Sequence, residues 1–234
     1  MAFDATDLPE KPGGTAPHVI VDEINHPVMS DEDVHHLAKV RRLRDGDLVS
    51  ATDGRGSWRW CAFKDSALTV AGEISVEPEP SPRLTVGFAL VKGSKPELVV
   101  QKLSELGIDT IIPFIAERSV VRWDDAKTER QGERLIKVAR EASTQSRRVW
   151  LPTVAPVARL SDLISAEGVV RAERDGRALS SGDTTVLIGP EGGWSPAEAD
   201  TTSVVGLGRT VLRAETAAIA AATLMVALRD GFAS

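Results

Sequence analysis

The stretch Leu187-Ile-Gly-Pro-Glu-Gly-Gly-Trp194 has the pattern of an apolar strand that ends in a glycine-rich turn. A second segment of this kind, Leu207-Gly-Arg-Thr-Val-Leu-Arg-Ala-Glu-Thr216, follows closely and leads into an alanine-rich helix. Glycine lets the main chain approach a ligand closely because no Cβ stands in the way. Two such turns close together predict one small-molecule pocket, built from backbone groups and from the free amides that begin the helix.

Around these turns, the second part of the chain alternates between apolar runs and helical patterns. Strands are expected at 84–91, 110–114, 168–171, 185–188 and 203–207, and helices at 96–106, 126–145, 196–199 and 214–229. This alternation predicts an α/β fold with a parallel sheet that is covered on both faces. Ligands of such sheets bind at the carboxyl ends of the strands, where both glycine turns lie. The Gly-Lys-Ser/Thr ending of a phosphate loop is absent, so a nucleoside triphosphate site of that type is excluded.

The first part of the chain has a different pattern. Short strands are expected at 18–22, 48–51, 58–63 and 67–76, with one helix at 30–38 that begins with a capping-box-like pattern. Several short strands and one small helix predict a compact β-barrel. The proline-rich stretch Glu77-Pro-Glu-Pro-Ser-Pro-Arg83 can continue neither a helix nor a sheet, so it predicts a linker. We therefore expect a barrel domain at 1–80 and an α/β domain at 81–234.

Composition narrows the possible function classes. Hydrophobic residues make up 42% of the 234 residues, and the single cysteine, Cys61, excludes a disulfide within the chain and fits a reducing, cytoplasmic location. The N-terminus lacks a signal-peptide pattern, and no uncharged apolar stretch is long enough to span a bilayer, so no membrane partner is expected. Residues 1–82 hold 15 acidic and 8 basic residues within a chain of net charge −6. A nucleic-acid surface must therefore be local.

The ordered set of short motifs along the chain is more specific than either glycine turn alone. The set comprises His35-His36-Leu37, Val40-Arg-Arg42, Gly46-Asp47, Lys92-Gly93, Gln101-Lys102, Glu105-Leu-Gly107, Glu117-Arg118-Ser119, Gln145-Ser146 with Arg148, Ile188-Gly-Pro-Glu-Gly-Gly193, Leu207-Gly208 and Leu212-Arg-Ala-Glu-Thr216. In this order the motifs resemble the RsmE family of 16S ribosomal RNA uridine-N3 methyltransferases, which is part of the SPOUT superfamily. The resemblance extends almost from end to end.

This resemblance implies an N-terminal PUA-like β-barrel and a SPOUT-type parallel-sheet domain whose C-terminal end forms a trefoil knot. It also implies S-adenosyl-L-methionine as the methyl donor and a homodimer built at the knot. The apolar helix from Ala217 to Leu228 suits either a dimer interface or burial within one chain. The residues expected to hold the donor are those of the two turns and one neighbouring strand end: Ala172, Ile188, Gly189, Pro190, Glu191, Gly192, Leu207, Gly208 and Leu212.

The chemistry of the implied reaction suggests roles for two arginines and two glutamates. Uracil N3 carries a proton and is a poor nucleophile while neutral. A guanidinium stays charged and cannot act as an ordinary base, but it can stabilise the uracil anion, a role that fits Arg148 or Arg213. The proton acceptor is Glu191 or Glu215, and the sequence does not choose between them. The chemistry needs no metal, and the pair His35 and His36 has no further ligand-type spacing nearby.

A basic run is the strongest positive cluster of the acidic first part, and it contains Lys39, Arg41, Arg42 and Arg44. Its two interpretations are an ordinary solvated surface and an edge that contacts RNA phosphates. With the resemblance we expect the second, with His35 and Lys92 as additional RNA contacts. The expected partner is 16S rRNA or the small ribosomal subunit.

The chain departs from the usual family pattern at three places. Thr144 stands where the family usually has Glu, Arg41 stands where it usually has Leu, and the basic residues common near the family's N-terminus are missing around His18. A carboxylate at position 144 therefore has no role here. Two alternatives stay open: a methyltransferase that acts on another RNA, and a non-catalytic RNA-binding factor of ribosome assembly.

Overall fold

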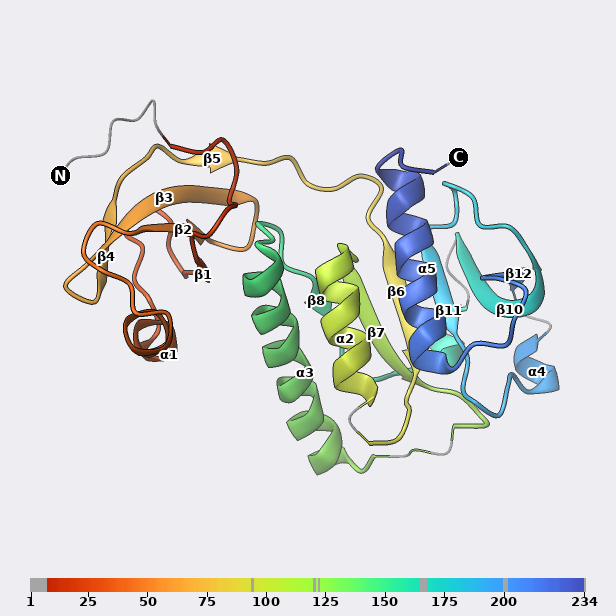
Figure 1. Cartoon of the computed structure of the whole chain (residues 1–234). Coiled ribbons are helices and arrows are strands. Elements are labelled where there is room, and N and C mark those ends of the chain that lie inside the picture. The colour runs from red at the N-terminus through yellow and green to blue at the C-terminus, as the bar shows by residue number, and fades with distance from the viewer. Residues whose placement is uncertain are drawn as a thin grey trace. The chain divides into compact units, whose positions relative to one another are not determined.

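A computed structural model describes residues 8–93, 95–119, 121, 123–164, 168–199 and 202–233, and it divides the chain into two compact bodies (Figure 1). The first body contains the chain up to Glu79 together with Ser143–Leu151. The second contains Pro80–Ala142 and the chain from Pro152 onward. The domain ranges expected from the sequence did not include the return of Ser143–Leu151 to the first body.

The first body is built on a five-stranded sheet. Its strands are β1 (His18–Ile20), β2 (Leu48–Thr52), β3 (Ser57–Lys64), β4 (Ala67–Val70) and β5 (Ser75–Val76). The pair β1–β2 is parallel, whereas β3 pairs antiparallel with β2, β4 and β5. The single strand expected at 67–76 is thus two strands. The Arg59 guanidinium bonds the carbonyl oxygen of Gly72 between them, at 2.8 Å and 3.1 Å.

The helix expected at 30–38 is present but changes its winding. It consists of α1 (Asp31–His35) followed directly by a π-helical turn, η2 (His36–Val40). The Ser30 hydroxyl caps its start by accepting from the Asp33 amide at 3.1 Å, as the capping pattern predicts. Leu37 is the buried residue of η2 and Ala38 packs half-buried against the same apolar cluster, whereas His36, Lys39 and Val40 are exposed.

The segment Ser143–Leu151 joins the first body through both backbone and side chains. The Gly56 amide donates to the Val149 carbonyl, and the Leu151 amide donates to the Gly54 carbonyl, each at 2.9 Å. Val149 is buried with Trp58 and Trp60 in one apolar cluster. Apolar packing therefore holds this distant piece of chain, which is why a linear reading of the sequence assigned it elsewhere.

The second body carries the alternating elements that the sequence predicts, with shifts of a few residues. Its strands are β6 (Thr85–Ala89), β7 (Thr110–Ile115), β8 (Thr153–Val154), β9 (Ala158–Arg159), β10 (Val169–Arg177), β11 (Thr185–Ile188) and β12 (Ser203–Val205). Its helices are α2 (Lys95–Leu106), α3 (Asp125–Ser146), whose last turn belongs to the first body, the 3-10 turn η3 (Leu160–Asp162), α4 (Pro196–Ala199) and α5 (Ala214–Arg229). The strands β8 and β9 were not expected, and β10 extends beyond the range expected.

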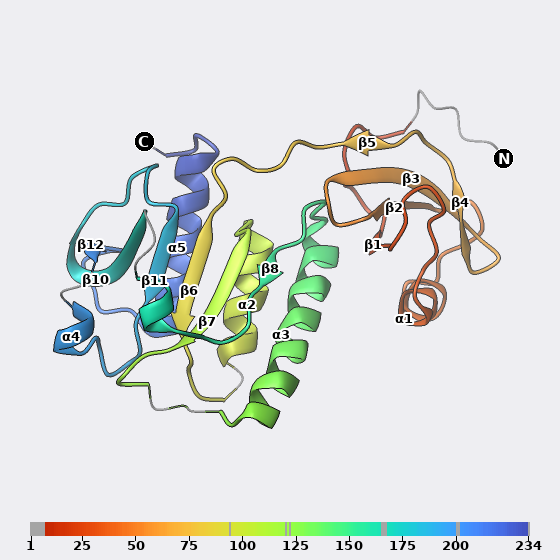
Figure 2. The same cartoon turned by 180° about the vertical axis from the view of Figure 1, so that it is seen from behind.

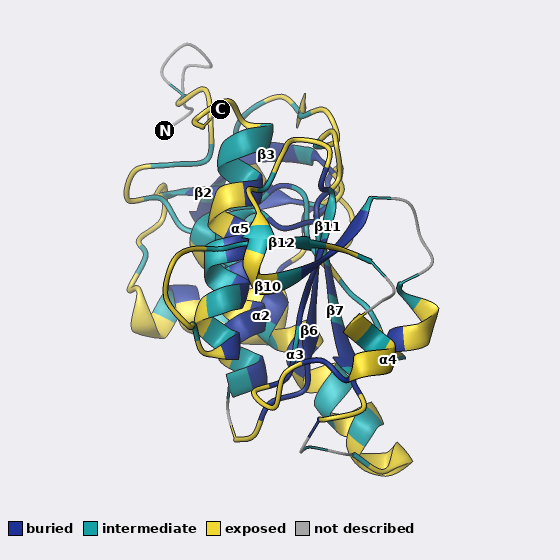
Figure 3. Ribbon diagram, turned by 90° about the vertical axis from the view of Figure 1, so that its right-hand side faces the viewer, coloured by how far each residue is buried: buried dark blue, intermediate teal, exposed yellow. Residues whose placement is uncertain are grey.

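The sheet of the second body is parallel and has the order β12-β10-β11-β6-β7-β8, with β9 also beside β7. Helices α2, α3 and α5 lie on one side of it (Figures 1 and 2). Figure 3 shows its central strands as buried, whereas the outer sides of the helices are partly exposed. The parallel strands therefore end together at one edge, which can hold a ligand.

Two apolar clusters cover the two faces of this sheet, as expected. The larger includes Val186 and Ile188 with residues of α2, α3 and α5. The smaller includes Phe114, Leu187 and Trp194, so the glycine turn that follows β11 itself supplies cover for the other face. In the described part of the chain, no helix is long and apolar enough to cross a membrane.

Candidate donor and substrate site

A cavity of about 770 Å³ lies in the second body, beside the middle of β10 and at the ends of β11 and β12. This volume suits a small-molecule ligand. Most of the residues expected to hold a donor line it: Ala172, Ile188, Gly189, Pro190, Glu191, Leu207, Gly208 and Leu212. The cavity is also lined by Arg213, Trp194, Lys95, Glu173 and Arg174. The structure thus brings both glycine turns together around one space.

The first turn is held in place by the ring of Trp194. This ring stacks on Phe114 with centroids 6.2 Å apart, and the Arg171 guanidinium lies 5.3 Å from its centroid. The ring nitrogen donates to the carbonyl oxygen of Ala172 at 3.2 Å. A Cβ on Gly189 would lie 2.8 Å from the ring, so only glycine fits while Trp194 keeps this position.

The second turn approaches the cavity through Gly208, whose φ of +149° is rarely adopted by residues with a side chain. A Cβ there would meet nothing within 4 Å, because the glycine faces open space. The turn leads into α5, and Arg213 is the N-cap residue of this helix without a side-chain capping bond. The first amides of α5 therefore begin beside the cavity wall formed by Ala214.

Three residues named from the sequence lie elsewhere. Gly192 is outside the lining, and its carbonyl oxygen accepts from Arg118 at 3.4 Å. Glu215 is outside the lining too, with a side chain only 14% exposed. Arg148 belongs to the first body, where its carbonyl oxygen lies 3.2 Å from Nε2 of His18. The structure therefore groups Arg213 and Glu191 at the cavity and does not add Glu215 or Arg148 to its lining.

The sequence analysis missed three charged residues of the lining, Glu173, Arg174 and Lys95, and Lys95 is the one that pairs with the proposed acceptors. Its ammonium lies 2.8 Å from Oε1 of Glu191 and 3.3 Å from Oε1 of Glu215. The hydrogen bond to Glu191 raises the pKa of Lys95, and the same bond lowers the pKa of Glu191. The available signal was position: Lys95 starts the helix after β6, so it had to lie near the ends of the neighbouring strands.

The backbone conformation at Arg148 is set by the way α3 ends at Ser146. The residue before it, Arg147, has a φ of +57°. The Arg147 amide donates to the Thr144 carbonyl at 3.3 Å and the Arg148 amide to the Ser143 carbonyl at 3.0 Å, which together form a Schellman cap. His18 is buried, and burial lowers its pKa to about 4, so the imidazole that bonds Arg148 is neutral.

The basic run of the first body is at its surface. His35, Lys39, Arg41, Arg42 and Arg44 are all exposed, and so is Lys92 in the second body. Arg42 has a φ of +56°, a conformation uncommon for a residue with a side chain. Among the described residues there is no group of three or more histidine, cysteine, aspartate or glutamate side chains that could hold a metal ion.

Comparison with known proteins identifies the class of this molecule. A family model described as an RNA methyltransferase domain matches residues 77–226, and one described as an RNA methyltransferase PUA domain matches residues 30–66. The chain thus contains an RNA methyltransferase domain and a PUA domain, which confirms the expected α/β fold with a parallel sheet and an N-terminal PUA-like domain.

The relatives identify the family. The ribosomal RNA small subunit methyltransferase E of Bacillus subtilis is 32% identical, with 81% of this chain and 85% of the relative covered. The enzyme of that name from Mycobacterium tuberculosis is also 32% identical, with 83% of each covered. The chain belongs to this methyltransferase E family, as the resemblance predicts.

Two solved structures connect the family to its donor. A putative methyltransferase from Legionella pneumophila, in complex with S-adenosylmethionine, is 25% identical with a TM-score of 0.79, covering 92% of this chain and 98% of that one. The methyltransferase E of Neisseria gonorrhoeae, bound to S-adenosylmethionine, is 25% identical with a TM-score of 0.77, covering 91% and 98%. The expected donor is therefore the one that these relatives bind.

Proposed function

We propose that this protein transfers a methyl group from S-adenosylmethionine to N3 of a uridine in 16S rRNA of the small ribosomal subunit, in the cytoplasm. The observation that carries the proposal is the single cavity formed by the two glycine turns, in a chain of the methyltransferase E family. Small-subunit RNA as substrate is what the names of the relatives state for those proteins. The uridine N3 specificity follows from the resemblance.

The residues of the cavity fit the donor. Ile188, Leu207 and Leu212 offer apolar walls for an adenine ring, and the main chain of the two turns offers amides and carbonyls beside them. Trp194 sets the shape of the first turn, so the walls are largely preformed. When bound, the donor supplies a methyl group on a sulfonium, which reacts by in-line displacement. The protein's part is to align the acceptor and favour its deprotonated form.

Of the two arginines proposed to stabilise the uracil anion, Arg213 lines the donor cavity, whereas Arg148 belongs to the first body. Arg213 is thus the better supported of the two for this role, because it lies in the same body as the donor cavity and lines it. Arg148 keeps its proposed role because its backbone is held firmly by the Schellman cap and by His18. Of the two proposed proton acceptors, Glu191 lines the cavity and Glu215 does not.

For RNA binding we propose the exposed basic run of the first body, with His35 nearby and Lys92 as a contact from the second body. These cations would hold the RNA backbone rather than read bases. Neutralising Arg42 and Arg44 removes two phosphate contacts, so the slope of log affinity against log salt should become shallower by about 1.4 to 1.8 units. RNA binding measured by anisotropy over a range of salt tests this role.

We further propose that the chain forms a homodimer through α5 and that the C-terminal segment is threaded into a trefoil knot. Helix α5 buries Ala214, Ala218, Ala221, Ala222 and Met225 within its own chain. Leu224 is left 38% exposed on another side of the helix, and small residues around it would allow a second helix to approach closely. Light scattering of the purified chain measures the oligomeric state.

The decisive experiment measures transfer of labelled methyl groups from the donor to small ribosomal subunits, to naked ribosomal RNA and to transfer RNA. Label at N3 of a 16S rRNA uridine is the expected result. Label on transfer RNA alone would assign the cavity to another RNA substrate. Donor binding without transfer to any RNA would make the protein a non-catalytic factor and would refute the proposal.

A further inference from the structure

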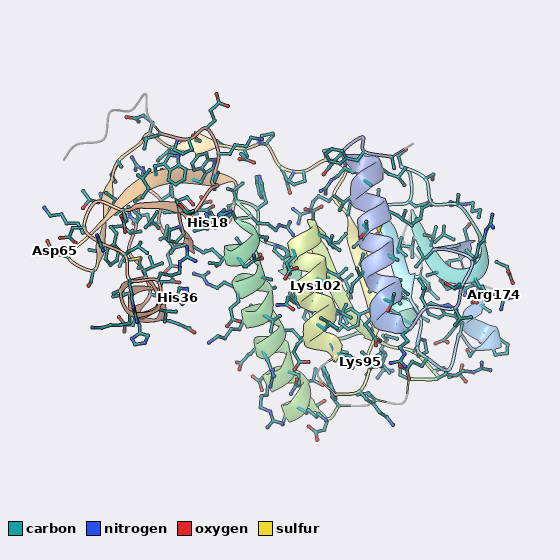
Figure 4. All side chains as sticks on the ribbon, viewed as in Figure 1. His18, His36, Asp65, Lys95, Lys102 and Arg174 are labelled. Carbon is teal, nitrogen blue, oxygen red and sulfur yellow. The ribbon has the colours of Figure 1, made fainter. Side chains whose placement is uncertain are left out.

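Lys95 has a position that neither the sequence motifs nor the comparisons explain. It is the first residue of α2, the element that follows β6 in the chain, and its side chain lines the cavity. Lys95 and Arg174 mark two sides of this space (Figure 4). The ammonium is bonded by two carboxylates, which fix it beside the second turn and the start of α5.

The two carboxylates bonded to Lys95 differ in their access to the cavity. Glu191 lines the cavity and its side chain is 58% exposed, so it can turn into solvent when a ligand arrives. Glu215 lies outside the lining, is 14% exposed, and has one carboxylate oxygen buried without a hydrogen-bond partner. Glu215 thus bonds the ammonium from outside the cavity, whereas Glu191 bonds it within the cavity, where a ligand would bind.

The charges around this ammonium favour an incoming anion. Lys92 and Arg213 also act on Glu191, because their charges help to lower its pKa after the hydrogen bond and charge of Lys95. Three cations therefore act on Glu191, whereas Glu215 pairs with Lys95. The remaining charged groups of the lining, Glu173 and Arg174 of β10, have opposite signs. This end of the cavity has a local excess of one positive charge.

The same geometry makes the Glu191 carboxylate a poor proton acceptor, because its bond to Lys95 lowers its pKa. A carboxylate that is bonded to an ammonium is stabilised in its charged form, so it binds a proton less readily. Uracil N3 gives up its proton only above neutral pH, so a base with a lowered pKa would gain little from accepting it. The cation in the cavity is better suited to the reaction, because it lowers the energy of the deprotonated base directly.

We propose that Lys95 stabilises the anionic form of the target uracil, by pairing its ammonium with a carbonyl oxygen of the base in place of Glu191. This inference rests on the proposed function. It adds Lys95 to the cations that stabilise the uracil anion, and it assigns Glu191 to pairing with Lys95 instead of accepting the N3 proton. The N3 proton leaves to water, and the N3 lone pair forms the new nitrogen–carbon bond. The carbon–sulfur bond breaks with its electron pair going to sulfur, so the donor leaves as a neutral thioether. Glu215 is the positioning residue that keeps the ammonium in place.

The test is the pH profile of kcat/KM for methyl transfer to small ribosomal subunits. For the unmodified protein, kcat/KM rises with pH to a plateau, and the midpoint of the rise is the apparent pKa of uracil N3 in the site. Lys95→Met should move this midpoint upward by at least about one pH unit, and lower the rate near neutral pH about tenfold or more. Lys95→Arg should restore the profile, because the charge is kept. Glu215→Gln should shift it in the same direction as Lys95→Met, but by less.

Glu191→Gln separates the proposal from its main alternative. Without the competing carboxylate, Lys95 is free to pair with the base, so the midpoint should move to lower pH. Loss of the pH-dependent rate in this variant would instead make Glu191 the proton acceptor and would overturn the proposal. The matched control is Lys102→Met, which removes a lysine of the same helix that pairs with Glu105 and lies outside the cavity lining. Its profile should match that of the unmodified protein.

Calorimetry with S-adenosylhomocysteine, the demethylated product of the donor, completes the test. Lys95→Met should bind it as the unmodified protein does. Weaker binding together with an unchanged pH midpoint would place Lys95 on the donor and overturn the proposal. If the unmodified protein binds this compound but methylates no RNA, the proposed function has failed as well. If it methylates RNA and Lys95→Met keeps its profile, only the role of Lys95 has failed.

Discussion

The two glycine turns of the second body and the segment Ser143–Leu151 of the first are both assigned to one reaction, but they are built differently. Each turn is a contiguous motif at the end of a parallel strand, so chain direction alone places it at the ligand edge. The segment Ser143–Leu151 is held by contacts with residues about 90 positions away in sequence. A substitution can therefore lower the stability of one body and leave the other folded. Loss of the second body would affect the donor cavity, and loss of the first would affect the position of Arg148.

The largest effect is expected from the buried ion pair of the second body. Asp109 bonds Arg229 at 2.8 Å and also accepts from the Leu84 amide at 2.9 Å, and both side chains are nearly inaccessible. Asp109→Ala removes the buried partner of the guanidinium and leaves it only the more exposed Asp230, at 2.9 Å, and the Gly107 carbonyl. The free energy of unfolding of this body should therefore fall by about 3 kcal/mol, the lower end of the cost of breaking a buried pair. Urea unfolding measures this loss. Hydrogen exchange should show faster opening in the second body while the sheet of the first stays protected.

The control for Asp109→Ala is Lys137→Met on α3. Its pair with Glu141 is 3.8 Å long, and both side chains are more than half exposed. Such a pair contributes about 0.5 kcal/mol or less. If the two variants lost similar free energies of unfolding, the buried pair of Asp109 and Arg229 would stabilise the second body no more than an exposed pair does.

The first body should respond to acid through His18. Burial lowers the folded-state pKa of this imidazole from 6.5 to about 4, so the folded body favours the neutral form. The stability that the first body gains from keeping His18 neutral is therefore fully present above pH 6.5 and is lost as the pH falls through about 4. The total loss in free energy of unfolding is on the order of 3 kcal/mol. Hydrogen exchange between pH 7 and 4 should show this loss in the first body. His18→Gln should flatten the dependence, whereas the exposed His26→Gln should not change it.

Donor binding tests the glycine turns of the second body, because the turn that contains Gly189 lines the donor cavity. Gly189→Val forces the Trp194 ring away from a Cβ that would lie 2.8 Å from it. The turn then loses the shape that Trp194 gives it, and donor affinity measured by calorimetry should fall about 10- to 100-fold, or about 1–3 kcal/mol. Gly132→Ala is the control, since nothing lies within 4 Å of its Cβ position on α3. An unchanged affinity for Gly189→Val would show that the turn does not shape the donor site.

The sequence predicted the parts of this molecule that depend on local pattern. The capping role of Ser30, the alternation of the second body and the meeting of the two turns follow from residue type and chain direction. The sequence could not predict that Lys95 pairs with two carboxylates, because their ammonium–carboxylate distances depend on how α2 and α5 pack. Nor could it predict that the end of α3 joins the first body. That contact depends on the tryptophans of β3, which carry no signal for Val149.

The smallest effect concerns the cap that precedes Arg148. Arg147 adopts a left-handed conformation at a position where helices usually have glycine, while its side chain bonds the carbonyl oxygens of Gly14 at 2.5 Å and Ala16 at 3.4 Å. Arg147→Ala loses these bonds and keeps the unfavourable conformation, whereas Arg147→Gly loses the bonds and relieves it. The glycine variant should therefore be more stable than the alanine variant by about 1 kcal/mol in urea unfolding. Equal stabilities would mean that the chain leaves α3 by another route, and that the backbone of Arg148 is not held where its proposed role needs it.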